Sequence, residues 1–263
     1  MPIFWIEILG LLTYSLTFIY VWHKRTTLEK VSTHLIPIVI VDIIVHGFIS
    51  YLNIDTAYGH DFGLFNIFNM TTWISMIIVL WNLIKYNSST LLLFSLPIAM
   101  ISILEVLLFD GIAPIKLEGN GLNILHILLG ISSMGILMLA AIQSVLILYV
   151  DRRLRISPAN LSPIFGSLQS IERYLLQLLT SGFILMTLSL ILVSLLPSEI
   201  TQTQVLHKVI LTLLSWFILA ILVFGYYLRG WRGVFAAKWT LIGVFLLMLG
   251  YFGSKLVLEF IIG

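Results

Sequence analysis

Eight long apolar stretches, separated by short polar segments, constrain the fold of this chain more than any other feature. A helix needs about 20 mostly apolar residues to cross the roughly 30 Å hydrocarbon core of a bilayer. The expected spans are approximately residues 3–22, 35–51, 65–85, 90–109, 122–150, 172–196, 205–228 and 236–261. The sequence therefore predicts an all-α polytopic membrane helix bundle, built as a single transmembrane domain over residues 1–263.

Composition agrees with this fold class and excludes others. Hydrophobic residues make up 60% of the 263 positions and charged residues 10%, whereas soluble domains average about 45–50% and about 25%. The short loops leave no room for a soluble catalytic domain, so we expect a non-catalytic protein whose first partner is the lipid bilayer, with no nucleic acid partner. The chain has no cysteine, which removes disulfides, iron–sulfur clusters and covalent haem attachment.

Basic residues predict the orientation of the bundle. Three of the fourteen, Lys116, Lys208 and Lys255, follow the even-numbered spans or lie in the last one, and the other eleven lie at the opposite ends of the helices. Because cytoplasmic loops carry the excess of Lys and Arg, we expect both termini outside the cytoplasm. The absence of transit-peptide character suits a multi-pass protein of the bacterial inner (cytoplasmic) membrane.

Histidines gather toward the outer ends of the expected spans. His46, His60, His126 and His207 lie there, and imidazole is well suited to ligate haem iron. We expect His126, His46 and His207 to be cofactor-binding, with His126 and His46 as the axial ligands of one haem iron in a shared pocket. Interfacial histidines without any ligand are also common, and the residues alone leave both interpretations open.

Two acidic residues within the spans are expected to support such a site. Asp42 lies one helical turn before His46, where a carboxylate can fix the tautomer of a ligating imidazole, although a structural bridge between helices explains the same spacing. Glu105 has no local partner in the sequence. It could meet a histidine, line a polar cavity or relay protons, because an ionisable residue in a span is costly without a role.

Several short motifs between residues 122 and 254 resemble the cytochrome c assembly (CcsA-like) family of haem-handling membrane proteins. They are residues 126–133 (HILLGISS), 149–154 (YVDRRL), 170–173 (SIER), 214–217 (LSWF), 229–233 (RGWRG) and 250–253 (GYFG). The length and the eight-span layout look most like the branch of small inner-membrane proteins called YpjD, beside the HemX-type regulators of haem synthesis.

The resemblance implies a non-covalent, b-type haem at the outer face and haem export or presentation to apocytochrome c. The first outer-face haem ligand of the family matches His126. Three family features are missing: the tryptophan-rich outer segment, the histidine after the GYFG motif, and the histidine after Trp216 in the seventh helix. The chain is therefore expected to keep the fold without the transferase role.

Two other function classes remain open at this point. Asp42 and Glu105 would suit a transporter or transport accessory, although broken helices and inverted repeats are not evident. A regulatory or scaffold protein that binds another membrane protein without a cofactor is the other alternative. A visible absorption spectrum of the purified protein separates a haem protein from both.

The predicted orientation can be tested with a reporter that is active only outside the cytoplasm. Fused to the C-terminus, it should be active, because the positive charges hold the intervening loops inside. A fusion within residues 152–155 should be inactive. The reverse pattern would refute the topology.

Overall fold

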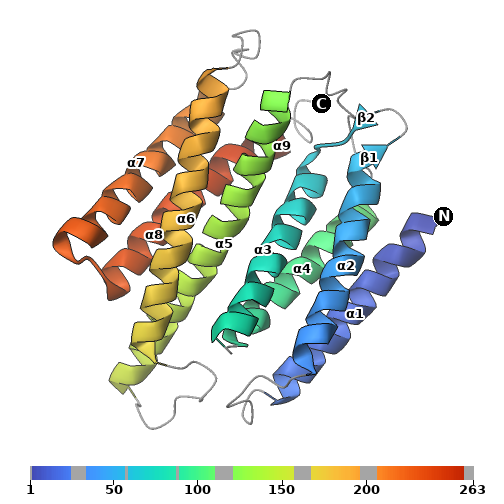
Figure 1. The fold of residues 1–263 in the computed structure, drawn as a ribbon, viewed down its shortest axis with the longest axis horizontal. Coiled ribbons are helices and arrows are strands. Elements are labelled where there is room, and N and C mark those ends of the chain that lie inside the picture. Colours follow the sequence, from blue (N-terminus) through green and yellow to red (C-terminus); the bar gives the residue numbers. More distant parts are fainter. Residues whose placement is uncertain are drawn as a thin grey trace. The chain divides into compact units, whose positions relative to one another are not determined.

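The computed structural model describes residues 2–24, 34–56, 59–86, 89–109, 121–156, 167–195 and 206–257. Within these ranges, eight helices are long and apolar enough to cross a membrane, which confirms the predicted fold class and number of spans. Figure 1 shows them in chain order: α1 (Pro2–Lys24), α2 (Leu35–Ile54), α3 (Leu64–Tyr86), α4 (Thr90–Leu108), α5 (Gly121–Ile156), α6 (Leu168–Ser194), α7 (Leu206–Arg229) and α8 (Gly233–Met248).

Helix ends extend beyond the apolar stretches where polar residues stabilise another turn. Helix α5 continues to Ile156, and Arg155 donates to both carboxylate oxygens of Asp151 at 2.9 and 3.2 Å. This pair is four residues apart, on one face of the helix. Helix α6 begins earlier than expected because the Ser167 hydroxyl accepts a hydrogen bond from the Ser170 N–H. Hydropathy marks the part of a helix inside the bilayer, whereas capping decides where the helix ends.

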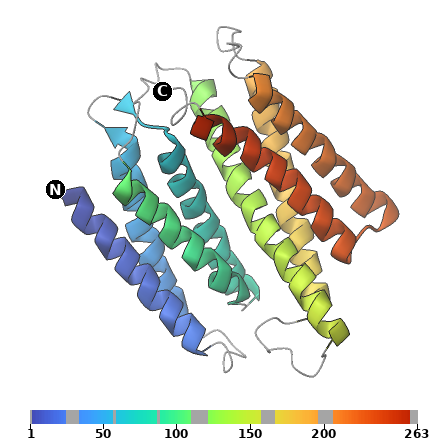
Figure 2. The ribbon, with the colours of Figure 1, turned by 180° about the vertical axis from the view of Figure 1, so that it is seen from behind.

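The chain divides into two compact units, α1–α4 and the helices from α5 onward. In the first unit, α1 lies against α2 and α4, α3 lies against α2 and α4, and α2 and α4 make a smaller contact with each other. A two-residue hairpin, β1 (Asp55–Thr56) and β2 (Gly59–His60), follows α2. In the second unit, shown from behind in Figure 2, α5 contacts α6 and α8, and α7 contacts α6 and α8.

Helix α8 continues through an irregular turn. It passes into a π-helical segment, η5 (Leu249–Gly253), and then into α9 (Ser254–Val257). The segment η5 contains the whole GYFG motif. A π-helical turn widens the helix by one residue and is often found at functional sites.

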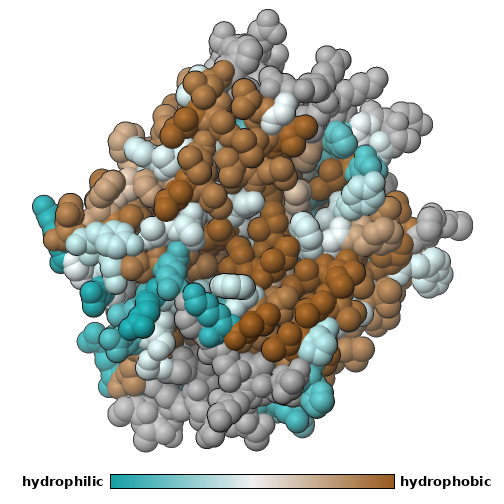
Figure 3. Space-filling model, viewed as in Figure 1, coloured by the Kyte–Doolittle hydropathy of each residue, from teal (hydrophilic) through white to brown (hydrophobic). Residues whose placement is uncertain are grey.

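The first unit buries several polar side chains and exposes many large apolar ones. Glu7, Asp42, His46 and Asn69 are buried. Large apolar side chains such as Trp5, Leu16, Ile44 and Trp81 are more than half exposed, and apolar residues cover much of the face seen in Figure 3. This arrangement is expected when the surrounding solvent is hydrocarbon and the buried polar groups bond to one another.

Small residues let the helices of the second unit approach closely. A Cβ at Gly182 would lie 2.8 Å from the Leu137 side chain, and one at Gly243 would lie 2.6 Å from Leu219. Serine hydroxyls cross both contacts and donate to the glycine carbonyls. The distances are 2.9 Å for Ser133 to Gly182 and 2.7 Å for Ser215 to Gly243. Small residues and hydroxyls are the usual means of helix association in membranes.

The RGWRG segment folds the end of α7 back on itself. Gly230 and Gly233 have φ angles of 70° and 64°, in the left-handed region that favours glycine. The turn brings the Trp231 indole against Gly225, whose added Cβ would overlap the ring. The backbone N–H of Trp231 donates to the Gly225 carbonyl at 3.4 Å.

Gly225→Ala should destabilise the protein, although alanine is the better helix former. The new methyl group displaces the Trp231 ring, and overpacking of this kind costs about 1–3 kcal/mol. Thermal unfolding in detergent measures the effect. Gly121→Ala is the matched control, because a methyl group added at Gly121 meets no packed neighbour within 4 Å in the described part of the chain. Equal melting temperatures for the two variants would contradict the contact.

Candidate functional site

A partly open pocket of about 190 Å³ lies within the second unit. Helices α5, α6, α7 and α8 and the segment η5 all contribute to its wall. The lining residues are His126, Ile127, Gly130, Ile131, Ser133, Met134, Met186, Ser189, Leu190, Lys208, Thr212, Leu247 and Tyr251. The pocket therefore joins the HILLG motif of α5 and the GYFG motif of η5 with the first turns of α7.

Ser189 fixes the ring of His126. The His126 Nδ1 lies 2.9 Å from the Ser189 carbonyl oxygen and 3.0 Å from its hydroxyl oxygen. A carbonyl oxygen can only accept, so Nδ1 carries the proton and Nε2 keeps its lone pair. The Ser189 hydroxyl in turn donates to the His126 carbonyl at 3.2 Å. A hydrogen bond to the remote ring nitrogen is the usual support of a metal-binding histidine.

Lys208 and Tyr251 form the charged part of the pocket wall. The Lys208 Nζ lies 4.2 Å from the centre of the Tyr251 ring, within the range of a cation–π interaction. Both side chains are half-buried. The pocket thus combines an apolar wall with one imidazole, one ammonium group and one phenol.

His207 is the third histidine predicted to bind a cofactor. It is exposed in the first turn of α7, directly before Lys208. The residues that line the pocket do not include it. Position at the start of a helix, which His126 and His207 share, therefore does not by itself bring a histidine into the pocket.

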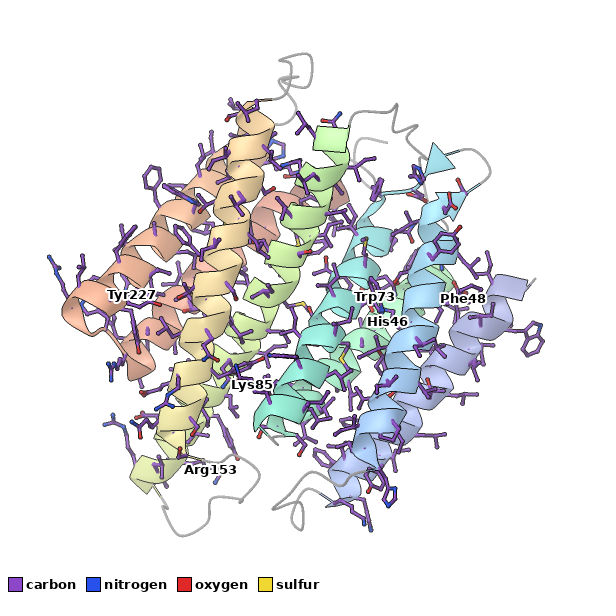
Figure 4. The ribbon with its side chains drawn as sticks, viewed as in Figure 1. His46, Phe48, Trp73, Lys85, Arg153 and Tyr227 are labelled. Carbon is purple, nitrogen blue, oxygen red and sulfur yellow. The ribbon has the colours of Figure 1, made fainter. Side chains whose placement is uncertain are left out.

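His46 lies in the interior of the first unit, on α2, where Figure 4 labels it. Its ring is fully buried, and its Nδ1 lies 3.0 Å from the Tyr14 hydroxyl of α1. Asn69 of α3 lies within hydrogen-bonding reach of the same ring. The Trp73 indole N–H donates to the Ile43 carbonyl at 2.9 Å, and the ring lies against Gly47.

The other predicted residue of α2, Asp42, contacts α1. Its Oδ2 lies 2.7 Å from the Thr17 hydroxyl, and the Thr13 side chain of α1 also contacts the carboxylate. Asp42 and His46 thus lie one turn apart on α2, and each bonds to its own residue of α1. Glu105 is half-buried on α4, and the half-buried His60 lies with its Nδ1 3.6 Å from Asp55 Oδ1 in the hairpin.

His46 and His126 belong to different units, and each is described within its own unit. The shared pocket predicted for them stays a prediction. Among the described residues, no three His, Asp or Glu side chains come together as a metal-ion site.

Comparison with known proteins agrees with the motifs in the pocket. The profile of the family described as Cytochrome C assembly protein matches residues 4–262, nearly the whole chain. The chain belongs to this family.

Relatives with curated names agree with the predicted branch. The chain is 28% identical over 145 residues to the inner membrane protein YpjD of Escherichia coli K12, and equally to that of strain O157:H7. Each match covers 55% of this chain and 55% of the relative, so the matched part spans about half the length of either protein. The name of these relatives places them in the inner membrane, which is the location predicted for this chain. No solved structure matches the chain significantly.

Sequence reasoning missed three residues of the pocket. In the sequence, Lys208 stands out only as one of the few basic residues on the outer side, and Tyr251 only as part of a motif. Ser189 gives no signal, because a serine within an apolar helix is common. The lysine offers only a weak signal, since a lysine near the start of a span can extend its ammonium group to the membrane interface.

The contact between Tyr14 and His46 predicts a measurable contribution to stability. Tyr14→Phe removes only the hydroxyl and should lower the free energy of unfolding by about 0.6–1.7 kcal/mol, as found for side-chain hydrogen bonds in membrane helices. Denaturation in detergent measures the change. Tyr227→Phe is the control, because Tyr227 is 63% exposed on α7. The assigned contact is wrong if both variants are as stable as the parent protein.

Proposed function

We propose that this chain is a non-catalytic haem-binding protein of the bacterial inner membrane, with His126 as an axial ligand of a non-covalent, b-type haem. The observation that carries the proposal is the hydrogen bond from His126 Nδ1 to the Ser189 carbonyl. It leaves the Nε2 lone pair for a metal, in a pocket built from the motifs of a cytochrome c assembly protein.

The chemistry of the pocket fits haem. Imidazole is a common axial ligand, the wall is mostly apolar, and Lys208 supplies a cation for a propionate. The volume of about 190 Å³ is below the roughly 300–1,000 Å³ of most ligand pockets, so it holds part of a macrocycle. The absence of cysteine makes the attachment non-covalent.

Each residue has a distinct task in this proposal. His126 binds the iron, Ser189 holds the imidazole in the required tautomer, and the apolar side chains of α5 and α6 exclude water from the ring. A bound haem supplies an iron centre that can change oxidation state. No covalent step is assigned to the residues of the chain.

The second axial position has three candidate donors. His46, the residue expected from the sequence, is buried in the first unit with its Nδ1 at the Tyr14 hydroxyl. His207 is exposed in the first turn of α7. Met186 lies in the wall of the pocket itself, and a thioether paired with histidine ligates haem in cytochromes c. Single substitutions separate these three.

Titration of the detergent-purified protein with haemin tests the proposal. A Soret band that saturates at one haem per chain is expected. His126→Ala should weaken binding by at least about tenfold, because even residues that only support a metal ligand contribute 10–100-fold.

His207→Ala is the matched control and should have the smaller effect, since His207 does not line the pocket. Identical spectra and affinities for the parent protein and His126→Ala would overturn the assignment. A colourless protein that does not take up haemin, but co-purifies with another membrane protein, would favour the scaffold function.

A further inference from the structure

We infer that the pocket selects its ligand by a carboxylate group, which Lys208 binds from a position set by Tyr251. The inference rests on the proposed function and names the part of haem that is recognised, a propionate. It is carried by the position of Lys208, by its contact with Tyr251 and by the charge of the pocket wall.

The position of Lys208 places its charge at one end of the ligand. Lys208 is the third residue of α7 and lines the same pocket as His126 of α5. Thr212, four residues further along α7, also lines the pocket. The Lys208 ammonium group therefore belongs to the part of the wall near the beginning of α7. Most other lining residues are apolar, among them Leu247, Met186 and Met134, and the hydroxyl side chains of Ser133, Ser189 and Thr212 lie between them. A ligand that is complementary to these lining residues has an apolar body and a negatively charged end.

The segment η5 sets the position of the lysine. Gly250 lets η5 approach α7 closely, because its added Cβ would lie 3.0 Å from Leu211 and 3.5 Å from the Lys208 carbonyl. The next residue, Tyr251, then lies under the Lys208 ammonium group, 4.2 Å from Nζ to the ring centre. A flexible lysine is ordered by this contact, which lowers the entropy lost when a ligand binds.

The charge of the wall favours an anion. Of the described side chains that line the pocket, Lys208 carries a formal positive charge and none is acidic. Helices α5 and α7 both begin near the pocket, and the partial positive charge of a helix N-terminus adds to the field. Charges interact strongly where hydrocarbon replaces water. Of the common anions, a carboxylate on an apolar body matches both parts of the wall.

Haemin and its dimethyl ester distinguish carboxylate recognition from binding of the macrocycle alone. The two probes share the iron and the ring, but the ester has no free propionate. The full chain in a neutral detergent should bind haemin at least tenfold more tightly than the ester. Lys208→Met should weaken haemin binding to the level of the ester and leave ester binding unchanged.

Three further variants complete the test. Lys238→Met removes an exposed lysine of α8 and should bind both probes as the parent protein does. Tyr251→Leu should lower the preference for haemin over the ester, whereas Tyr251→Phe, which keeps the ring, should retain it. A merely structural role for Tyr251 would change the affinity for both probes equally.

The possible results separate this inference from the proposed function. Equal binding of both probes by the parent protein, or an equal loss of both in Lys208→Met, would overturn carboxylate recognition and leave haem binding intact. Failure of the parent protein to bind either probe would overturn the proposed function and this inference with it.

Discussion

A bilayer offers the polar groups of a helix bundle no partner except one another, and the buried hydrogen bonds of this chain follow from that constraint. In the second unit, serine hydroxyls donate to glycine carbonyls of neighbouring helices, which they can reach because glycine has no side chain. In the first unit, hydroxyl groups of α1 bond to the carboxylate and imidazole of α2. The same need for partners that holds the helices together also orients the side chains available for chemistry.

The two units meet this constraint in different ways. The interior of α1–α4 holds polar groups among apolar side chains, with His46 fully buried and bonded to Tyr14. The second unit keeps a partly open pocket in which His126 is half-buried and held by α6. Exposure and tautomer, rather than the number of histidines, make His126 the stronger ligand candidate. The family profile matches residues of both units.

Much of the fold could be predicted from the sequence because the hydropathy of a span is the sum of values that belong to its single residues. The eight spans and the all-α class were predicted in this way and are confirmed. The ends of α5 and α6 were missed because they depend on local hydrogen bonds of Asp151 and Ser167. Hydrogen-bond partners on neighbouring helices were harder to predict. Spacing along α2 suggested that Asp42 would bond to His46, whereas each bonds to a residue of α1 that only the packing of the helices brings near.

The bond between His126 and Ser189 has a consequence for assembly. The two residues are 63 positions apart, and they meet only when α5 and α6 are correctly aligned along their length. Sliding either helix by one turn, about 5.4 Å, would remove the carbonyl acceptor from Nδ1 and free the ring to change tautomer. The hydrogen bond that leaves Nε2 with its lone pair thus requires a correctly aligned pair of helices. Ligand affinity at this histidine therefore reports the register of two helices, and a ligand that binds there stabilises the assembled form over any misaligned one.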